Sequence, residues 1–223
     1  MRERKSNSIK NVTEKREEEL DELSKIFETL EKDISDIYPY EKAEGEISVR
    51  YKDPSYLNER DRRSLVRSIF AFLEGTCFCL RRTLVRNFKD DLSATQIMAL
   101  QEEQIEIDAS GRIDKKQAKI TLLKLIRLTA LISADLFPSA KGLECKGPKF
   151  EALVRATKIR DRLMHPRSSK HLEVSDDEIR DTVSGYLWFH SLMVCILIQT
   201  TKSLESLVKE LKSQTQISPR KTE

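Results

Sequence analysis

Residues 59–88 read ERDRRSLVRSIFAFLEGTCFCLRRTLVRNF, and this stretch decides the fold class. Its apolar residues recur in alternating steps of four and three, at Val66, Phe70, Leu73, Cys77, Leu80 and Leu84. This spacing lines one apolar stripe along a helix, as in the seam of a helical bundle. We therefore predict a long helix that packs against other helices.

Four more segments carry the same periodicity. Residues 14–37, 118–136 and 149–164 each place apolar residues on one face, and a last helix runs from a capping box at Ser175 to about residue 211. The stripes consist of Leu20, Leu23, Phe27, Leu30 and Ile34; of Ala118, Leu122, Leu125, Thr129, Ile132 and Leu136; of Ala152, Ala156, Ile159 and Leu163; and of Val183, Leu187, His190, Val194 and Leu197. The stripes over residues 59–88 and 118–136 have matching seams, so we expect these two helices to be core partners.

Two segments between these helices are harder to interpret. Residues 93–107 are predicted to form a helix that begins with Ser93 as its cap and ends before the turn at Ser110 and Gly111. Residues 38–54 contain two prolines and a glycine, and the alternation near their end is too short for a strand, so we predict a loop. The fold class expected is an all-α bundle of about five to six helices with a long final helix.

The domain organisation follows from length and from the polar ends of the chain. A chain of 223 residues is long enough for one well-buried core, and we predict a single helical domain over residues 13–212. Residues 1–12 are basic and polar, and residues 213–223 are polar without periodicity. Both ends are predicted to be disordered tails.

The charge of the whole chain does not select a partner. The 40 basic and 37 acidic residues leave a formal net charge of +3, which is too weak a field to argue for nucleic acid. An anionic partner such as RNA would have to be bound by a local patch of basic side chains.

The cysteines and the longest apolar run indicate a cytoplasmic protein. Three of the four cysteines lie among apolar residues of helical segments, and Cys77 and Cys79 point to different sides of one helix, so we expect reduced thiols. The longest apolar run, residues 186–198, contains His190 and is shorter than the ~20 residues that span a bilayer. We predict a core helix there, with no membrane segment and no secretory signal.

One constellation could carry chemistry, the sequence IRDRLMHP at residues 159–166. Pro166 disfavours helical geometry at His165, so the side chains of Arg160 and His165 are expected to converge at a helix end. A guanidinium binds phosphate and an imidazole carries protons near neutral pH, and both are needed to cut RNA by attack of a 2′-hydroxyl. Asp161, one helical turn before His165, could orient either group. No cofactor or metal would be required.

The same residues also have an ordinary structural interpretation, because Arg, His and Pro are common at the C-terminal end of a helix. Residues 149–166, followed by a long final helix, resemble the signature region of the HEPN superfamily, whose motif is Arg, a polar residue, three further residues and His. The resemblance implies a metal-independent endoribonuclease that acts as a homodimer, with Arg160, His165 and Asp161 as catalytic residues facing a second copy. Such proteins act as toxins, in phage defence or in RNA processing, and many are catalytically silent.

The position two residues after the histidine departs from one HEPN group. Toxins paired with a nucleotidyltransferase antitoxin carry tyrosine there, whereas this chain has Arg167. A tyrosine-modifying antitoxin is thus disfavoured, while another antitoxin or regulatory protein partner stays open.

Other polar residues near the motif are open to two interpretations each. A group of basic residues could follow an RNA backbone or form a solvated helix face: Arg155, Lys158, Arg162, Arg167 and Lys170. We expect His171 to be a solvated loop residue and His190 a hydrogen-bonded core histidine. Glu74 interrupts an apolar helix and either faces solvent or pairs with Arg160 in the core. The alternative to a ribonuclease is a catalytically inactive helical interaction or dimerisation module, or a regulatory partner of another enzyme.

Overall fold

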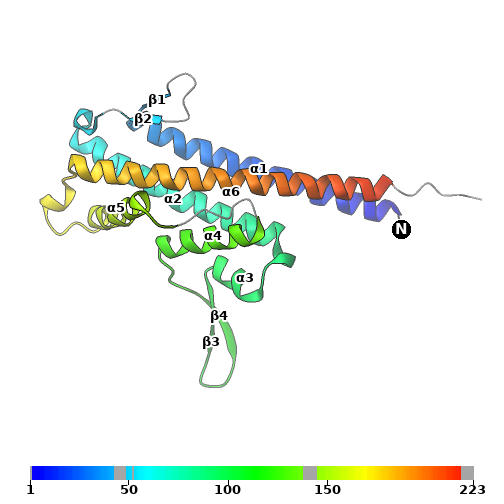
Figure 1. Ribbon diagram of the computed structural model, residues 1–223. Coiled ribbons are helices and arrows are strands. Elements are labelled where there is room, and N and C mark those ends of the chain that lie inside the picture. Colours follow the sequence, from blue (N-terminus) through cyan, green and yellow to red (C-terminus); the bar gives the residue numbers. More distant parts are fainter. Residues whose placement is uncertain (1, 43–48, 52, 138–144, 217–223) are drawn as a thin grey trace, which may run out of the picture.

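Helices make up most of the described chain. The computed structural model describes residues 2–42, 49–51, 53–137 and 145–216. In this part of the chain the helices are α1 (Arg2–Ile37), α2 (Glu59–Asn87), α3 (Ala94–Leu100), α4 (Leu122–Leu136), α5 (Pro148–Met164) and α6 (Asp176–Gln216). The predicted all-α bundle with a long final helix is confirmed (Figure 1).

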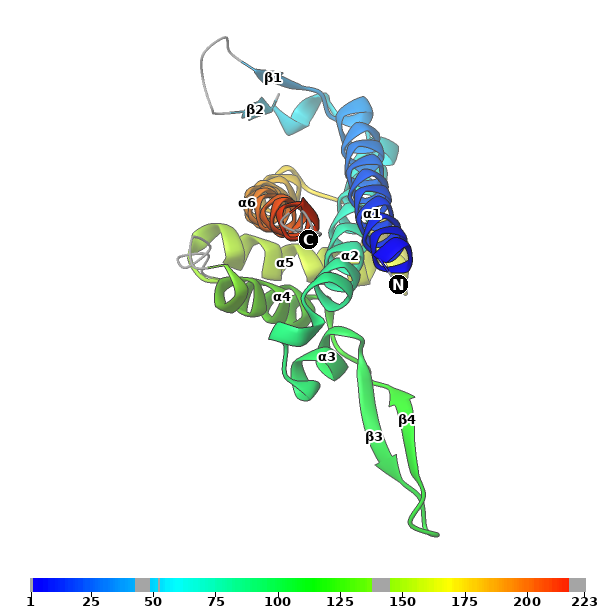
Figure 2. The ribbon, with the colours of Figure 1, turned by 90° about the vertical axis from the view of Figure 1, so that its right-hand side faces the viewer.

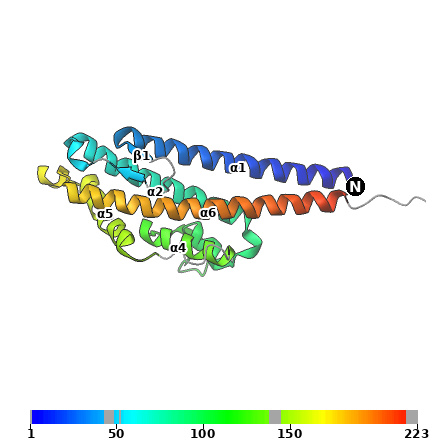
Figure 3. The ribbon, with the colours of Figure 1, turned by 45° about the horizontal axis from the view of Figure 1, so that its top comes forward.

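Helix α2 lies at the centre and contacts α1, α4, α5 and α6 (Figures 2 and 3). All the predicted seam residues of α2 are buried, which follows from the four-and-three spacing of its apolar side chains. The predicted packing of α2 against α4 is confirmed, because the Sγ of Cys77 in α2 lies 3.7 Å from the Oγ1 of Thr129 in α4. A capping interaction fixes the start of α2, where Asn58 Oδ1 accepts a hydrogen bond of 2.9 Å from the Asp61 N–H.

Helices α5 and α6 form the most extensive helix pair. The stripe predicted for α5 is buried as expected, with Ala156 fully inaccessible. The two helices approach closely at Gly185, where a Cβ atom would lie 2.7 Å from the Cα of Leu153. The capping box that begins α6 is also as predicted, because Glu178 N–H donates to Ser175 Oγ and Ser175 N–H donates to Glu178 Oε2.

Helix α6 contains a stretch, Asp176–Ser203, that is long and apolar enough to cross a membrane by length and composition alone. In this fold 44% of its most apolar 18-residue window is buried, so part of the stretch packs inside the bundle. Core side chains along this stretch include Tyr186, Phe189 and Met193, which pack against the other helices.

The chain ends differ from the sequence prediction. Helix α1 begins at Arg2, so residues 2–12, expected to be a tail, are helical. The helix extends this far because no glycine or proline interrupts residues 2–37. Helix α6 likewise runs through residues 213–216, and the rest of the predicted C-terminal tail, residues 217–223, lies outside the described residues. The two helices reach the same end of the bundle (Figures 1 and 3).

Two β-hairpins form in segments for which no strands were predicted. Strands β1 (Tyr40–Lys42) and β2 (Val49–Tyr51) pair within the predicted loop, whose residues 43–48 and 52 lie outside the described residues. Strands β3 (Glu103–Ile107) and β4 (Ile113–Gln117) pair where a helix over residues 93–107 was expected. That prediction was wrong beyond Leu100, because Glu102 adopts a positive φ of 56° and turns the chain out of α3. The next helix begins at Leu122 rather than at residue 118, because the hairpin pairing continues through Gln117 and the Ala118 N–H donates to the Glu102 carbonyl.

Candidate active site

His165 ends α5 as predicted from the proline that follows it. Its backbone leaves helical geometry at φ −129° and ψ 61°, while its N–H still donates a 3.0 Å hydrogen bond to the Asp161 carbonyl. The imidazole is exposed to solvent, and it forms no hydrogen bond or ion pair with any residue that the structure describes. The side chain is therefore available to a ligand.

Arg160 lies about a turn and a half earlier, and two carboxylates hold its guanidinium. Its Nη2 donates to Glu74 Oε1 of α2, and its Nη1 donates to Asp161 Oδ1 over 3.0 Å. The guanidinium carbon also lies 5.9 Å from the ring centre of Phe70. Glu74 therefore both faces solvent and pairs with Arg160, and the alternative of a pair in the core is wrong, since the side chains of Glu74 and Arg160 are 46% and 34% exposed.

Arg160 and Asp161 border a cleft of about 500 Å³ between α2, α4 and α5. Its walls combine aromatic and aliphatic side chains with a few polar ones: Phe70, Glu74, Cys77, Phe78, Arg81, Glu102, Ile120, Thr121, Leu122, Leu125, Thr157, Arg160 and Asp161. His165 is not among these residues, so within one copy the imidazole lies outside the cleft. The structure therefore joins Arg160 to Asp161 directly, but no described contact joins Arg160 to His165.

A second ion pair in the cleft was missed from the sequence. Arg81 of α2 is only 4% exposed, and it donates to Glu102 Oε1 and to the Leu100 carbonyl, each over 2.6 Å. The sequence does not show that Arg81 is paired, because its partner Glu102 is 21 residues away. The one local signal of its burial is its position directly after Leu80, a residue of the apolar stripe of α2.

The thiols near the cleft are not activated. Cys77 and Cys79 are free, and burial raises the pKa of both. A raised pKa keeps a thiol protonated at neutral pH, and the thiolate is the nucleophile. The cleft therefore offers no reactive cysteine.

The five basic residues predicted to bind RNA divide into two groups. Arg155 forms two 2.6 Å hydrogen bonds to Asp181, and Arg162 donates to Glu178 over 3.0 Å, so both tie α5 to α6. Lys158, Arg167 and Lys170 have exposed side chains with no ion pair among the described residues. Only the second group is free to contact an anionic ligand.

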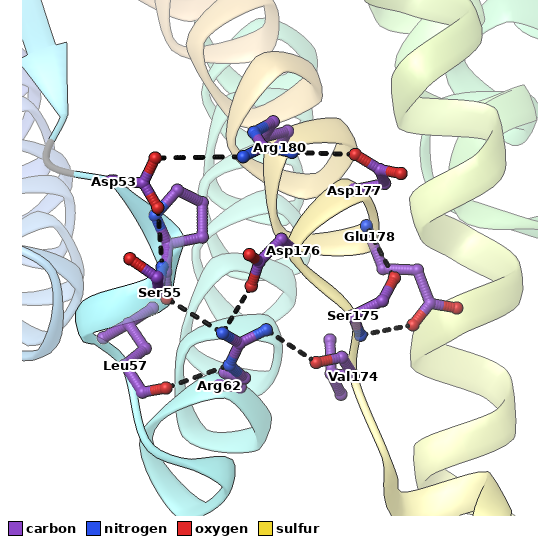
Figure 4. A network of polar contacts seen from close by, with 11 residues as sticks. Asp53, Ser55, Leu57, Arg62, Val174, Ser175, Asp176, Asp177, Glu178 and Arg180 are labelled. Atoms are coloured by element: carbon purple, nitrogen blue, oxygen red, sulfur yellow. Dashed lines mark hydrogen bonds and ion pairs between the residues drawn. The ribbon is translucent and has the colours of Figure 1, made fainter.

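The segment after His165 is held in place by α5, α2 and α6. Arg162 Nη2 donates to the Glu173 carbonyl over 2.7 Å, and Arg62 of α2 donates to the Val174 carbonyl over 2.9 Å. Figure 4 shows that Arg62 also reaches Asp176 of α6 and the backbone beside Ser55. These contacts fix the C-terminal end of the loop that follows His165.

The same polar network includes a carboxyl group with a lowered pKa, that of Asp53. Asp53 accepts a 2.9 Å hydrogen bond from the Ser55 N–H, and its carboxylate faces Arg180 (Figure 4). The hydrogen bonds from Ser55, followed by the charges of Arg180 and Arg62, lower the pKa of Asp53 below its usual range. This carboxylate belongs to the framework, not to the cleft.

The remaining histidines have structural surroundings. His171 Nδ1 accepts a 3.1 Å hydrogen bond from the Arg167 N–H, in a short turn after the motif. His190 packs against Phe27 and Phe72, and its Nε2 lies 3.3 Å from Glu31 Oε1. His190 thus lies at the edge of the core rather than within it, beside buried aromatic rings but with its side chain 26% exposed.

Comparisons with family models, with curated proteins and with solved structures found no match. Within the described residues, no group of three or more His, Cys, Asp and Glu side chains is placed to hold a metal ion.

Proposed function

We propose that this chain is a metal-independent endoribonuclease of the HEPN type, which acts in the cytoplasm as a toxin or phage-defence effector. One observation carries the proposal: an exposed imidazole, His165, follows within about a turn and a half of a guanidinium, Arg160, that two carboxylates hold at a cleft. A proton acceptor and an oriented phosphate-binding fork are the two groups that this cleavage requires.

The reaction would begin at a ribose 2′-hydroxyl. His165 accepts its proton, and the oxygen attacks the adjacent phosphorus. The bond from phosphorus to the 5′-oxygen of the next nucleotide breaks, that oxygen takes a proton from water as it leaves, and His165 then releases its proton to solvent. The products are a 2′,3′-cyclic phosphate and a free 5′-hydroxyl.

Arg160 would stabilise the charge that develops on the non-bridging phosphate oxygens. To do so it must exchange one carboxylate for the phosphate. Asp161 is the carboxylate that can leave more easily, because its side chain is 58% exposed and lies on the same helix, whereas Glu74 anchors the guanidinium from α2. Glu74 would then keep the planar fork aimed at the substrate.

The proposed substrate is single-stranded or looped RNA, whose 2′-hydroxyls and bases are accessible. Lys158, Arg167 and Lys170 are the residues proposed to contact its backbone, because their charges are not neutralised by carboxylates among the described residues. We also propose a homodimer, in which the Arg160 and His165 pairs of two copies face each other, with an antitoxin or regulatory protein as a further partner.

A specific observation favours the alternative of a catalytically inactive interaction module. Glu74 and Asp161 both accept hydrogen bonds from the guanidinium of Arg160. In an inactive module, the ion pair of Arg160 with Glu74 would have a purely structural role and would hold α5 against α2. In that case the exposed His165 would end the helix and have no other role.

The two functions are separated by incubating the purified protein with mixed RNA in excess chelator. A ribonuclease cleaves, and His165→Ala lowers its rate about a hundredfold or more, as the loss of a general base does. His171→Ala is the matched control, because it removes a nearby histidine of the same loop and should leave the rate unchanged. If wild-type protein leaves RNA intact while its α-helical circular dichroism is normal, the interaction module is the better account.

A further inference from the structure

The cleft that Arg160 borders has room for a ligand larger than a phosphate group. Its volume of about 500 Å³ and its mostly apolar walls are typical of sites that bind small organic molecules. Charge does not favour an anion in its interior, because more carboxylates than guanidinium groups line it: Glu74, Glu102 and Asp161 against Arg81 and Arg160. We therefore expect a neutral ligand inside the cleft, and a phosphate only at the rim, where Arg160 can bind it.

Phe78 of α2 gives the cleft a flat apolar wall. This residue is 48% exposed, although α2 lies at the centre of the bundle. The guanidinium carbons of Arg81 and Arg82 lie 5.9 and 5.5 Å from the centre of its ring, and these contacts restrain the ring. An exposed aromatic ring in the same cleft as an arginine is a surface on which a nucleobase can stack.

Glu102 supplies a hydrogen-bond acceptor in the same cleft. Its Oε1 accepts the 2.6 Å hydrogen bond from Arg81, while its Oε2 forms no hydrogen bond with any residue that the structure describes. The side chain is 21% exposed, and the buried side chain of Arg81 holds it in place. An ionised carboxylate only accepts hydrogen bonds, so a ligand at this position has to offer donors.

The start of α4 supplies hydrogen-bond donors beside Glu102. The Ala118 N–H donates over 2.6 Å to the Glu102 carbonyl, which places the chain that leads into α4 next to Glu102. Thr121 and Leu122 line the cleft, and the Thr121 side chain makes no capping hydrogen bond. The first backbone N–H groups of α4 therefore have no partner among the described residues, and the positive end of the helix favours an acceptor atom.

Arg81 adds a buried donor without a partner. Its side chain is 5% exposed, and its Nε–H forms no hydrogen bond within the described chain. Buried donors without a partner are uncommon in folded proteins, and each one calls for an explanation. An acceptor atom of a ligand in the cleft would supply the missing partner.

We propose that the cleft binds a guanine base of the RNA substrate. The Watson–Crick edge of guanine carries the acceptor O6 beside two donors, N1–H and the N2 amino group. Glu102 accepts from both donors, the first N–H groups of α4 donate to O6, and the base stacks on Phe78. The proposal rests on the proposed function in one respect, that the phosphate adjoining this guanosine is bound by Arg160 at the rim.

The other bases present the wrong pattern to Glu102. Adenine and cytosine each have one amino donor beside a ring nitrogen that accepts, and uracil has one N–H between two carbonyls. Each of them turns an acceptor toward the carboxylate, which itself can only accept. A site built to hydrogen-bond one group rejects analogues that lack this group, so we expect the cleft to select guanine.

Isothermal titration calorimetry of the purified chain with nucleoside 5′-monophosphates tests the pocket without RNA cleavage. Guanosine monophosphate should bind about tenfold more tightly than inosine monophosphate, which lacks the N2 amino group, and adenosine monophosphate should bind more weakly still. Glu102→Gln replaces the carboxylate by an amide of the same shape, and the preference for guanine over adenine should disappear. A purely structural role of Glu102 would instead weaken the binding of all three nucleotides equally and leave the preference intact.

Two further variants separate stacking from base selection. Phe78→Leu should weaken the binding of all three nucleotides about tenfold without changing their order, because stacking does not distinguish the bases. Glu106→Gln is the matched control for Glu102→Gln, since Glu106 pairs with Lys116 in the β3–β4 hairpin and does not line the cleft. This control should change neither the affinity nor the preference.

Equal affinity for guanosine and adenosine monophosphates would overturn the proposal, as would a preference that survives in Glu102→Gln. So would the absence of guanosine monophosphate binding at millimolar concentrations. Inorganic phosphate that competes as strongly as guanosine monophosphate would also overturn it, because the site would then bind only an anion at Arg160. The RNA assay is scored separately. Guanine preference without RNA cleavage would support the pocket and count against the ribonuclease, whereas RNA cleavage without any preference for guanine would do the reverse.

Discussion

The contact of α5 with α6 at Gly185 provides the sharpest test of how the site is positioned. Gly185→Ala adds a Cβ that would lie 2.7 Å from the Cα, 2.9 Å from the Cβ and 2.9 Å from the N of Leu153. Two of these atoms belong to the backbone and cannot rotate away. The helices would have to separate by roughly 0.7 Å to reach ordinary van der Waals contact. Arg160 and His165, which α5 carries, would move with it.

The expected cost follows from two opposing effects. Alanine in place of glycine within a helix stabilises by about 1 kcal/mol. Overpacking of a core contact costs about 1–3 kcal/mol, and more where backbone must move, so we expect a net loss of about 2 kcal/mol for Gly185→Ala. For a chain of this size that loss lowers the melting temperature by about 4–8 °C.

Thermal and urea unfolding, followed by circular dichroism, measure the effect against a matched variant. Gly75→Ala also replaces a glycine in mid-helix, but its Cβ meets only the flexible Cδ1 of Leu30 at 3.0 Å. It should therefore leave stability unchanged or raise it by up to about 1 kcal/mol. Equal stability of the two variants would show that α5 does not pack on Gly185 as described.

Three further predictions concern the cleft and the β3–β4 hairpin. Arg81→Met should cost about 2 kcal/mol in urea unfolding, less than a fully buried pair would, because Glu102 can turn toward water once it is unpaired. Arg160→Lys should lower RNA cleavage about a hundredfold despite its retained charge, because an ammonium cannot replace the two-pronged fork; a rate equal to that of the wild type would remove Arg160 from the mechanism. Hydrogen bonds from Ser110 and from neighbouring backbone N–H groups lower the pKa of Asp108 in the turn of the β3–β4 hairpin below 3.8. The charged form of Asp108 is thus favoured in the folded state, so hydrogen-exchange protection of the β3–β4 hairpin should be complete above about pH 4. The protection should fall as the pH drops through the lowered pKa of Asp108, and Asp108→Ala should abolish this pH dependence.

Local signals in the sequence were sufficient to predict the helices that position the motif. The four-and-three spacing of apolar residues located α2, and a proline located the end of α5 at His165. The Ser175 capping box located the start of α6. Each of these signals acts within one or two helical turns, which is the range that periodicity and capping describe.

The β3–β4 hairpin was not predicted, because the residue before it, Glu102, favours a helix by its intrinsic propensity. Glu102 is a good helix former, yet it adopts a left-handed conformation because Arg81 and Ala118, both distant in sequence, hold its side chain and carbonyl. The alternation of Ile105 and Ile107 and the turn at Gly111 were visible in the sequence. They were outweighed by the helical pattern that precedes them.

The candidate site was predictable in its residue types but not in its pairing. The motif indicated Arg160, Asp161 and His165, and it did not show that the cleft takes in only the first two. The basic cluster could not be divided by sequence either, because the carboxylates that neutralise Arg155 and Arg162 lie 26 and 16 residues away on α6. Such partners become neighbours only through the packing of α5 on α6.

The chemistry of the cleaved RNA ends tests the central claim most directly. Wild-type protein, incubated in excess chelator with a short RNA of defined sequence, should leave a 2′,3′-cyclic phosphate and a free 5′-hydroxyl, as resolved by mass spectrometry. The same oligonucleotide with one deoxyribose at the cut site should resist cleavage there, since its nucleophile is missing. Ends that carry a 5′-phosphate, or equal cleavage at the deoxyribose, would contradict attack by the 2′-hydroxyl and with it the role assigned to His165.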